Sequence, residues 1–398
     1  MSVYLDYAAA TPLDPCVEKV MRPFFQKQFG NPSSFHTPGK EAKEAIQSAR
    51  EKIADILQVR PDEILFTSGG TESDNLAVLG VARANFTHGK HVIVSAIEHH
   101  AVLEAALFLE KKEGFSVTYL KPDRDGIVTA KQVRESLRPE TTLVSVMYAN
   151  NEIGTIQPIA EIGNAIQKYR AQQKTVFPVF HTDACQAAGY LDINVEKLHV
   201  DLLTLNGNKI YGPKGTGLLY IKRGIKIQPL QFGGAQERGL RPGTENVGGI
   251  VGLAEALKIT QTEKEKEAAR LAKLRDFFIS ELLSKLPKVR LNGHSTKRLP
   301  NNVNVSCMDV EGEALLLYLD AAGIYASTGS ACASASLDPS HVILALGLPY
   351  EVSHGSLRFS LGRSTTKKDI QTVLKILPPL VEKLRAISPV KVDEKYFS

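Results

Sequence analysis

The sequence predicts an α/β protein in which helices cover both faces of a mostly parallel central sheet, with a second, smaller α+β domain beside it. Between residues 60 and 225, short apolar strand patterns alternate with helical patterns, as in parallel sheets with crossover helices. Around residue 257 this alternation gives way to a long charged helical pattern, followed by smaller strands and helices. With 398 residues, the chain is long enough for two domains.

Each expected strand of the first region is a short apolar run that ends in polar residues. These strands are EILFTSGG (63–70), HVIVSAIEHH (91–100), FSVTYLKPD (115–123), TTLVSVMYANNE (141–152) and FPVFHTDACQ (177–186). The helical patterns between them are TESDNLAVLGVARA (71–84), AVLEAALFLEKKEG (101–114) and AEIGNAIQKYRAQQ (160–173). Sheets of this kind bind ligands in the crevice beyond the carboxyl ends of the strands, where the polar residues are expected.

The second region opens with a long helix over residues 257–286. We interpret its charged stretch, EKEKEAARLAK, as a solvated face of that helix. We expect residues 13–256 to form the large domain, and residues 1–12 together with 257–398 to form the small domain. The first dozen residues should therefore return to the small domain or lie across the cleft.

The composition argues against several classes of protein. Hydrophobic residues make up 43% of the chain and charged residues 23%, which is ordinary for a globular protein. The net charge of +5 gives no strong case for nucleic-acid binding, although it would suit an acidic protein partner. The N-terminal sequence has no signal-peptide pattern, and no apolar run reaches the roughly 20 residues that span a bilayer. We expect a cytoplasmic protein that binds neither nucleic acid nor membranes.

The four cysteines are widely spaced and form neither a CxxC pair nor a metal-ligand pattern. Cys16, Cys185 and Cys307 are interpreted as buried apolar residues, which is the common fate of free cysteine. Cys332 differs, because its surroundings, ASTGSACASASLDPS, consist mostly of small residues and predict a mobile loop. A thiol on such a loop could attack a bound substrate and then travel; the alternative is a spare surface cysteine.

A glycine-rich turn predicts an anion site at the end of the first strand. Gly69 and Gly70 end the strand, and Thr71 begins a helix. Free backbone N–H groups and the helix dipole bind anions at such a position. The alternative is that Thr71 simply caps the helix. The spacing is not G-x-G-x-x-G, so a dinucleotide site is not indicated.

Two further groups of residues, one at Asp183 and one at Lys209, combine with the anion site. Asp183 and Gln186 end a buried strand, where a carboxylate needs a cationic or donor partner unless it caps the next helix. Lys209 occupies a glycine-rich turn between apolar runs in LLTLNGNKIYGPKGTGLLYI (202–221), although taken alone it would be a surface lysine. A phosphate site, a strand-end aspartate and a fixed lysine are together what pyridoxal phosphate (PLP) requires. The lysine forms the Schiff base, and the aspartate keeps the ring nitrogen protonated.

Ordered motifs along nearly the whole chain carry a family resemblance. They are YLDYAAATPLDP, FGNPSSFH, FTSGGTESDNLA, EHHAVL, NNEIGTIQPI, HTDACQAAG, NKIYGPKGTGLLY, RPGTENV, STGSACASASLDPSHVILALG and LRFSLGRSTT. In these motifs the chain resembles the cysteine desulfurases of the NifS/IscS group, within the class V aminotransferase family of fold-type-I PLP enzymes. The resemblance implies a three-layer PLP fold and a PLP cofactor.

The resemblance assigns roles around the cofactor ring. It implies that Lys209 is the Schiff-base lysine and that Asp183 pairs with the pyridine nitrogen. Gln186 is expected to contact the ring hydroxyl, and His99 to stack on the ring and move protons. Asn151 is expected beside both the cofactor and the substrate.

It also assigns roles at the edges of the site. Thr71 and the backbone at Gly70 are expected to hold the phosphate. Thr244 resembles the threonine that reaches the phosphate of the partner subunit, which implies a homodimer with shared sites. Arg358 resembles the arginine that binds the substrate carboxylate in a bidentate pair. Cys332 resembles the cysteine that receives the sulfur, on a long loop like that of the IscS-like subgroup.

The chain departs from the family pattern directly before the lysine. The family usually has Ser-x-His-Lys there, and both the serine and the histidine help to hold the phosphate. This chain has Asn206 and Asn208 at those two positions. The two amides can still donate hydrogen bonds, so both residues are kept as expected cofactor contacts.

The implied activity is PLP-dependent conversion of L-cysteine to L-alanine, with a persulfide formed on Cys332. The sulfur would pass to an acceptor protein such as an iron–sulfur scaffold, or serve other thio-cofactors or tRNA. No metal ligand set is expected. One alternative is a selenocysteine lyase or another class V PLP transferase, such as an aminotransferase. A transaminase would not need Cys332, so this residue distinguishes the two activities. An alternative from a different class is a catalytically silent scaffold or sulfur-relay protein.

Overall fold

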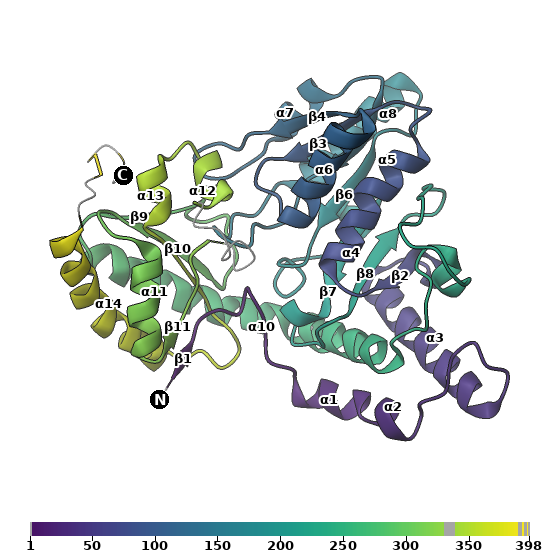
Figure 1. Cartoon of the computed structure of the whole chain (residues 1–398), viewed down its shortest axis with the longest axis horizontal. Coiled ribbons are helices and arrows are strands. Elements are labelled where there is room, and N and C mark those ends of the chain that lie inside the picture. The colour runs from purple at the N-terminus through teal and green to yellow at the C-terminus, as the bar shows by residue number, and fades with distance from the viewer. Residues whose placement is uncertain (1, 330–338, 389–391, 394–395, 397–398) are drawn as a thin grey trace.

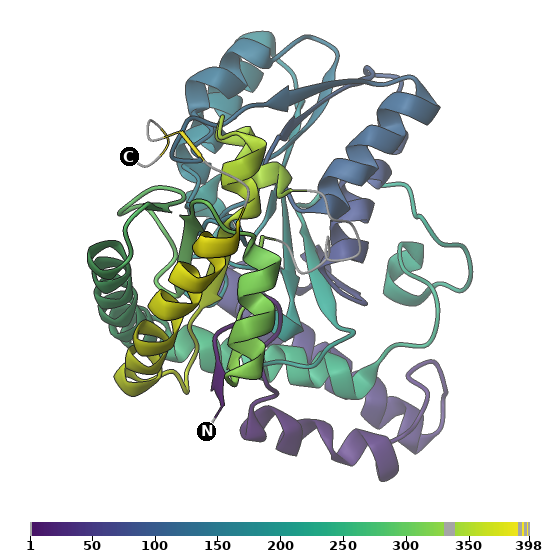
Figure 2. The same ribbon diagram turned by 60° about the vertical axis from the view of Figure 1, so that its left-hand side comes forward.

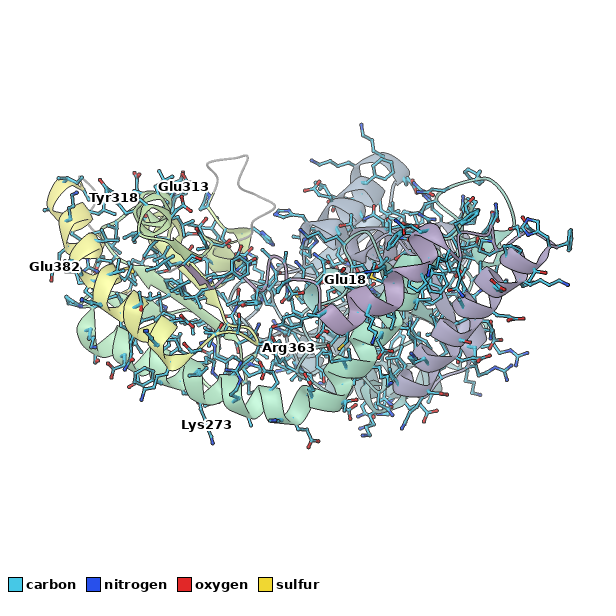
Figure 3. The ribbon with its side chains drawn as sticks, turned by 90° about the horizontal axis from the view of Figure 1, so that it is seen from below. Glu18, Lys273, Glu313, Tyr318, Arg363 and Glu382 are labelled. Atoms are coloured by element: carbon cyan, nitrogen blue, oxygen red, sulfur yellow. The ribbon has the colours of Figure 1, made fainter. Side chains whose placement is uncertain are left out.

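The computed structural model describes residues 2–329, 339–388, 392–393 and 396 of the chain. Figure 1 shows a larger part built on one wide sheet and a smaller part on the left that contains both termini. The helix α10 runs along both parts, which is clearest from below in Figure 3.

The larger part is built on a seven-stranded sheet with the strand order β2-β8-β7-β6-β5-β3-β4. β8 runs antiparallel to its neighbours β2 and β7, and the other neighbouring pairs are parallel. The strands are β2 (Ile64–Thr67), β3 (His91–Ser95), β4 (Ser116–Leu120), β5 (Thr141–Ser145), β6 (Val179–Asp183), β7 (Leu202–Asn206) and β8 (Gly217–Ile221). The prediction of a mostly parallel central sheet is therefore confirmed.

Helices cover this sheet on both faces because alternate strand residues point to opposite sides. Ile93 and Phe180 belong to an apolar core shared with α3, α8 and the first part of α10. Val92 and Val179 belong to a second core shared with α5, α6 and the π-helical turn before α5. The helices beside the sheet are α3 (Thr37–Leu57), α4 (Gly70–Asn75), α5 (Val81–Ala84), α6 (His100–Glu113), α8 (Ile159–Gln173) and α10 (Val247–Lys285), with a π-helical turn at Leu76–Gly80 joining α4 to α5. The result is the expected three-layer arrangement.

The smaller part has its own sheets and its own core. A three-stranded antiparallel sheet has the order β12-β10-β9, and β1 pairs in parallel with β11. The strands are β1 (Val3–Tyr4), β9 (Val289–Leu291), β10 (Asn302–Cys307), β11 (Ile324–Tyr325) and β12 (Ser356–Ser360). Figure 2 shows α11 (Gly312–Ala321) and α14 (Lys367–Ile387) side by side, and both contribute to this core.

The N-terminal segment joins the small part, as one of the two expected arrangements has it. Val3 pairs with Ile324, and Leu5 is fully buried in the small core. The division at residues 12/13 and 256/257 stays a prediction, because α10 contributes Leu257 to the core of the large sheet and Leu271 to the small core without a break.

The long helix begins ten residues earlier than the sequence predicts, at Val247 instead of residue 257. Its first turns contain glycines, which normally disfavour a helix. These glycines allow close packing: a Cβ at Gly252 would lie 2.5 Å from Met21 Sδ, and one at Gly249 would lie 2.5 Å from Thr216 Cγ2. Tertiary contact therefore overrides the local preference. Lys273, in the charged stretch, points into solvent as expected (Figure 3).

The remaining helices are short. They are α1 (Pro15–Met21), α2 (Pro23–Gln26), α7 (Ala130–Ser136), α9 (Val195–Leu198), α12 (His341–Ala345) and α13 (Tyr350–His354), with 3₁₀ turns at Pro61–Glu63, Gly207–Lys209 and Gln236–Gly239. The prediction that Cys16 is buried is wrong: it lies at the exposed start of α1, whereas Cys185 and Cys307 are buried as expected. Among the residues described, no helix is both long and apolar enough to cross a membrane.

Candidate active site

A cavity of about 370 Å³ lies where β6 and β7 end, beside the start of α4. Ten of the residues expected to bind cofactor or substrate line this one cavity. They are Gly70, Thr71, His99, Asn151, Asp183, Gln186, Asn206, Asn208, Lys209 and Arg358. Residues more than 280 positions apart in the chain thus meet at the carboxyl ends of the strands.

Lys209 is fixed by the N-terminal segment. The chain leaves β7 through a 3₁₀ turn that ends at Lys209, whose Nζ donates a hydrogen bond to the carbonyl oxygen of Ala9 at 2.5 Å. Thr11 binds the same turn on both sides, donating its N–H to Asn208 O and accepting the N–H of Tyr211 on Oγ1. The lysine is therefore half-buried and held at the cavity wall, unlike a surface lysine.

Asp183 and Gln186 lie on the same wall. Asp183 ends β6, is 7% exposed, and accepts the backbone N–H of Cys185 on Oδ1 at 2.8 Å. Gln186 donates from Nε2 to the carbonyl oxygen of Ala8 at 3.0 Å. A carboxylate buried to this degree favours a cationic partner in the cavity.

The turn from β2 into α4 forms the anion-binding end of the cavity. Gly69 has φ 155°, and the helix that begins at Gly70 continues through the π turn to Ala84, so its first N–H groups and its dipole face one end of the cavity. A Cβ at Gly70 would lie 3.1 Å from Cys185 Sγ, which leaves little room for a larger residue. Within the described part of the chain, Asn206 Oδ1 is buried at this end without a hydrogen-bond partner.

Arg358 brings a positive charge from the small part into the cavity. It lies on β12, is 2% exposed, and donates from Nη1 to Asn151 O at 3.1 Å. Its Nη2 forms an ion pair with Asp6 Oδ1 at 2.8 Å. Its Nε has no hydrogen-bond partner among the residues that the structure describes. A guanidinium that still has an unused N–H can donate a hydrogen bond to a substrate carboxylate.

His99 precedes α6 and caps it. Its Nδ1 accepts the N–H of Ala101 at 3.1 Å, so in the neutral ring the proton is on Nε2. This places an imidazole N–H at the cavity wall, in a fixed orientation.

The surroundings of the cavity are rich in buried groups whose neutral form is favoured. Burial raises the pKa of Glu98 well above its usual value, although Glu98 accepts the N–H of Met147 at 2.6 Å. Burial likewise raises the pKa of Glu152, whose carboxylate bonds Ser340 Oγ. The thiol of Cys185 also has a raised pKa, first because it is buried and then because Asp183 is close. Cys185 is therefore a packing residue and not a nucleophile.

One expected site residue, Thr244, is not in the cavity. Thr244 is exposed instead. Cys332 lies outside the described residues. The sequence interpretation missed three contributors, namely Asp6, the carbonyls of Ala8 and Ala9, and the buried acid Asp74. Asp6, Ala8 and Ala9 stand within the motif YLDYAAATPLDP, which marked the segment but not these contacts.

The residues present fit PLP. The cavity offers a helix start for a phosphate, a lysine amine, and the buried carboxylate of Asp183. In the part of the chain that the structure describes, Arg358 Nε is a donor without a partner, on a residue that lines the cavity. Among the described residues, no cluster of His, Cys, Asp and Glu is arranged to hold a metal ion.

Comparison with known proteins agrees with this geometry. The model of the aminotransferase class-V family matches residues 3–373. The chain is 52% identical over 393 residues to the cysteine desulfurase IscS of Dictyoglomus turgidum, covering 99% of this chain and 98% of that protein. A solved structure of a NifS-like protein superimposes with a TM-score of 0.89 at 37% identity, covering 96% of this chain and all of that one. The structure of SspA in complex with cysteine gives a TM-score of 0.77 at 37% identity, covering 90% of this chain and 99% of that one.

The fold and the site define a class V aminotransferase, a PLP enzyme of fold type I, and the chain belongs to that family. Within the family its relatives are close enough to be specific. The chain is a member of the NifS/IscS group of cysteine desulfurases.

Proposed function

We propose that this enzyme removes sulfur from L-cysteine, releases L-alanine, and receives the sulfur as a persulfide on Cys332. The observation that carries the proposal is the single cavity that unites Lys209, Asp183 and Arg358. These side chains match a cofactor-binding amine, a partner for a ring nitrogen, and a receptor for an amino-acid carboxylate. The solved structure of the similar protein SspA with cysteine supports cysteine as the substrate.

The transfer balances without an outside oxidant or reductant. The thiolate of Cys332 attacks the sulfur of the substrate, an S–S bond forms, and the Cβ–S bond breaks. The electron pair of the broken bond stays on Cβ, which takes up a proton and becomes the methyl group of alanine. Cysteine and a thiol thus give alanine and a persulfide.

Residues of the chain prepare this step. PLP, when bound, supplies an electron sink for the pair left when the α proton departs. In this proposal Lys209 Nζ takes that proton, Asp183 holds the ring nitrogen in its protonated form, and Arg358 fixes the substrate carboxylate. His99 Nε2–H is placed at the cavity wall as a proton donor.

The Cys332→Ser variant tests this function, with Cys16→Ser as the matched control because Cys16 is an exposed cysteine. Cys332→Ser should keep the absorption of bound PLP, yet release almost no sulfide or alanine from L-cysteine in the presence of a reducing thiol. Cys16→Ser should behave like the parent. Full sulfide release by Cys332→Ser would reject the persulfide step. A separate variant, Lys209→Ala, should lose the absorption of bound PLP, which would not be expected if the protein were a catalytically silent scaffold.

We further propose a homodimer with shared sites. Phe29, Phe35 and Phe232 are 75%, 93% and 84% exposed in the single chain, which is unusual for such large apolar side chains. Their loops are neighbours, because residues 32–33 and 235–238 line one hollow. Thr244 is exposed and follows residues 235–238 in the chain. The family resemblance implies that it binds the phosphate in the partner's site.

Sedimentation tests the dimer. The parent should sediment as a dimer, and the double variant Phe29→Ser with Phe232→Ser should shift towards monomer and lose PLP more easily. The single variant Phe108→Ser is a suitable control, because Phe108 is 44% exposed on α6, away from these loops. A parent monomer that turns over cysteine would contradict the proposal.

We propose a cytoplasmic enzyme whose persulfide supplies an iron–sulfur scaffold protein. The support is the long small-residue sequence around Cys332, which resembles the IscS-like subgroup. Radiolabelled sulfur from cysteine should appear on a purified scaffold when the parent is present and not with Cys332→Ser. Equal labelling of the scaffold by the parent and by Cys332→Ser would contradict this role for Cys332.

A further inference from the structure

A second buried carboxyl group, Asp74, lies beside Asp183 in the cofactor cavity. It belongs to α4, is 1% exposed, and lines the same cavity as Asp183. Its Oδ1 has no hydrogen-bond partner among the described residues. No motif in the sequence assigns a role to Asp74, and the proposed sulfur transfer does not use it.

The basic group nearest to Asp74 is an imidazole that already has other partners. His181 is fully buried on β6, and its ring nitrogens lie 2.8 Å from Ser145 Oγ and 3.0 Å from Thr204 Oγ1. Its Nε2 is 3.6 Å from Asp74 Oδ1, beyond hydrogen-bond distance. A neutral imidazole satisfies one hydroxyl as donor and the other as acceptor. Burial also lowers the pKa of His181 to about 3, so the ring carries no charge to offset one on Asp74.

The other charged groups around Asp74 are mostly acidic. Asp183 ends the neighbouring strand β6, and Glu98 follows β3; a negative charge on either disfavours one on Asp74. Burial is the larger cause, and together these raise the pKa of Asp74 well above its usual value, against a hydrogen bond from Thr204. Cys185 has a raised pKa and stays neutral, and Lys209 lines the same cavity. Two neighbouring buried carboxyl groups cannot both ionise without a large cost.

We propose that Asp74 is a neutral carboxylic acid beside Asp183, and that its neutrality leaves Asp183 as the carboxylate that faces the ring nitrogen. Asp74 is thus a positioning residue. Because it acts through Asp183, this role does not depend on which thiol takes the sulfur. It would hold equally for another PLP reaction in this cavity.

Infrared difference spectroscopy of the holoenzyme at pH 8 tests the proposal directly. The difference between the parent and Asp74→Asn should show the C=O band of a protonated carboxyl group. The difference between the parent and Asp183→Asn is the matched control and should show carboxylate bands instead. Carboxylate bands in the Asp74 difference would overturn the proposal. If Asp74→Asn does not fold, parent protein labelled with ¹³C in the aspartate carboxyl groups answers the same question. A protonated-acid band that moves with the label supports the proposal, and its absence rejects it.

The pH dependence of unfolding gives a second readout. The folded protein keeps a proton on Asp74 at pH values where the unfolded chain, with an aspartate pKa of roughly 3.9, has lost it. Rising pH therefore destabilises the parent relative to Asp74→Asn, by up to about tenfold per pH unit in the unfolding equilibrium constant. The two proteins should diverge in this direction between pH 5 and 7 in urea titrations. Parallel curves would mean that Asp74 is ionised and would overturn the proposal.

Discussion

Arg358 shows how the site depends on single residues from distant segments. Its guanidinium contacts Asn151 from the large part and Asp6 from the N-terminal segment, and Nε has no partner in the described structure. The planar fork of an arginine can bind Asp6 and a substrate carboxylate at once, whereas lysine is a point charge.

We therefore expect Arg358→Lys to weaken substrate binding while leaving the cofactor in place. Loss of one charge-assisted hydrogen bond, worth about 1.5–3 kcal/mol, should raise KM for L-cysteine about tenfold to a hundredfold. Steady-state kinetics with L-cysteine measure this effect, and Arg22→Lys, at an exposed ion pair, is the control. An unchanged KM in Arg358→Lys would mean that the carboxylate binds elsewhere.

The two asparagines before Lys209 also lead to a prediction. Both line the cavity, and the buried Oδ1 of Asn206 lacks a partner among the described residues. The family usually has serine and histidine there. If one charge-assisted contact to the phosphate is missing, PLP should bind about tenfold to a hundredfold more weakly than with the usual residues.

We expect the double variant Asn206→Ser with Asn208→His to retain more PLP during dialysis than the parent, with the Lys209 linkage unchanged. Absorbance of the protein-bound cofactor over time measures retention. The variant Lys214→Ala, in the same glycine-rich segment but exposed, is the control. Equal rates of PLP loss in the parent and the double variant would show that the asparagine amides already replace those donors.

Most cavity residues could be predicted because they are polar side chains directly after apolar strands. Asp183 and Asn206, which end β6 and β7, follow this rule, whereas Gly70 was predicted from the glycine turn after β2. The contacts of Lys209 and Gln186 could not be predicted, because both bind backbone carbonyls, of Ala9 and Ala8. A backbone carbonyl is present at every residue, so it leaves no signal in the sequence.

At the scale of elements, the strand and helix patterns of residues 63–186 correspond to β2–β6 and the helices between them. These elements could be predicted because apolar runs alternate with polar ends in the sequence. The start of α10 was missed because its glycines disfavour a helix locally, and only the packed structure shows their purpose. Gly252 is the clearest case, because any side chain there would meet Met21 and Pro213.

Gly252→Ala should therefore destabilise the protein by roughly 1–3 kcal/mol, as expected for overpacking. Gly248→Ala is the matched control in the same helix. A Cβ at Gly248 makes only ordinary contacts at 3.4 Å, so the better helix propensity of alanine should make this variant neutral or slightly stabilising. Urea unfolding of both variants measures the difference. Equal stabilities would show that Met21 moves aside without cost.

At the scale of the whole molecule, Arg363 links the small part to the turn that holds Lys209. Its guanidinium lies 4.2 Å from the ring centroid of Tyr211 and forms an ion pair with Asp14 at 2.7 Å. Its backbone N–H donates to Tyr211 Oη at 2.8 Å. Arg363 lies between the two parts in Figure 3, so it fixes their relative position across the cavity.

We expect Arg363→Ala to lose about 1.5–3 kcal/mol of stability, because a partly buried, charge-assisted contact and its stacking on Tyr211 disappear. Arg22→Ala removes an exposed ion pair with Glu18 and should change stability by no more than about 1 kcal/mol. Denaturant unfolding compares the two variants. If Arg363→Ala were as stable as Arg22→Ala, the two parts would be linked by other contacts, such as Arg358 with Asn151.

The pairing of β1 with β11 has a consequence for how the protein is made. Val3 is synthesised 321 residues before its partner Ile324. At roughly 5–20 residues per second, the first strand waits about 15–60 s before it can pair. The carbonyl of Ala9, which holds Lys209, belongs to the same waiting segment. The large sheet can therefore form during translation, but the cofactor cavity closes only after Ile324 has been synthesised, so before that point the nascent chain is not ready to be loaded with PLP.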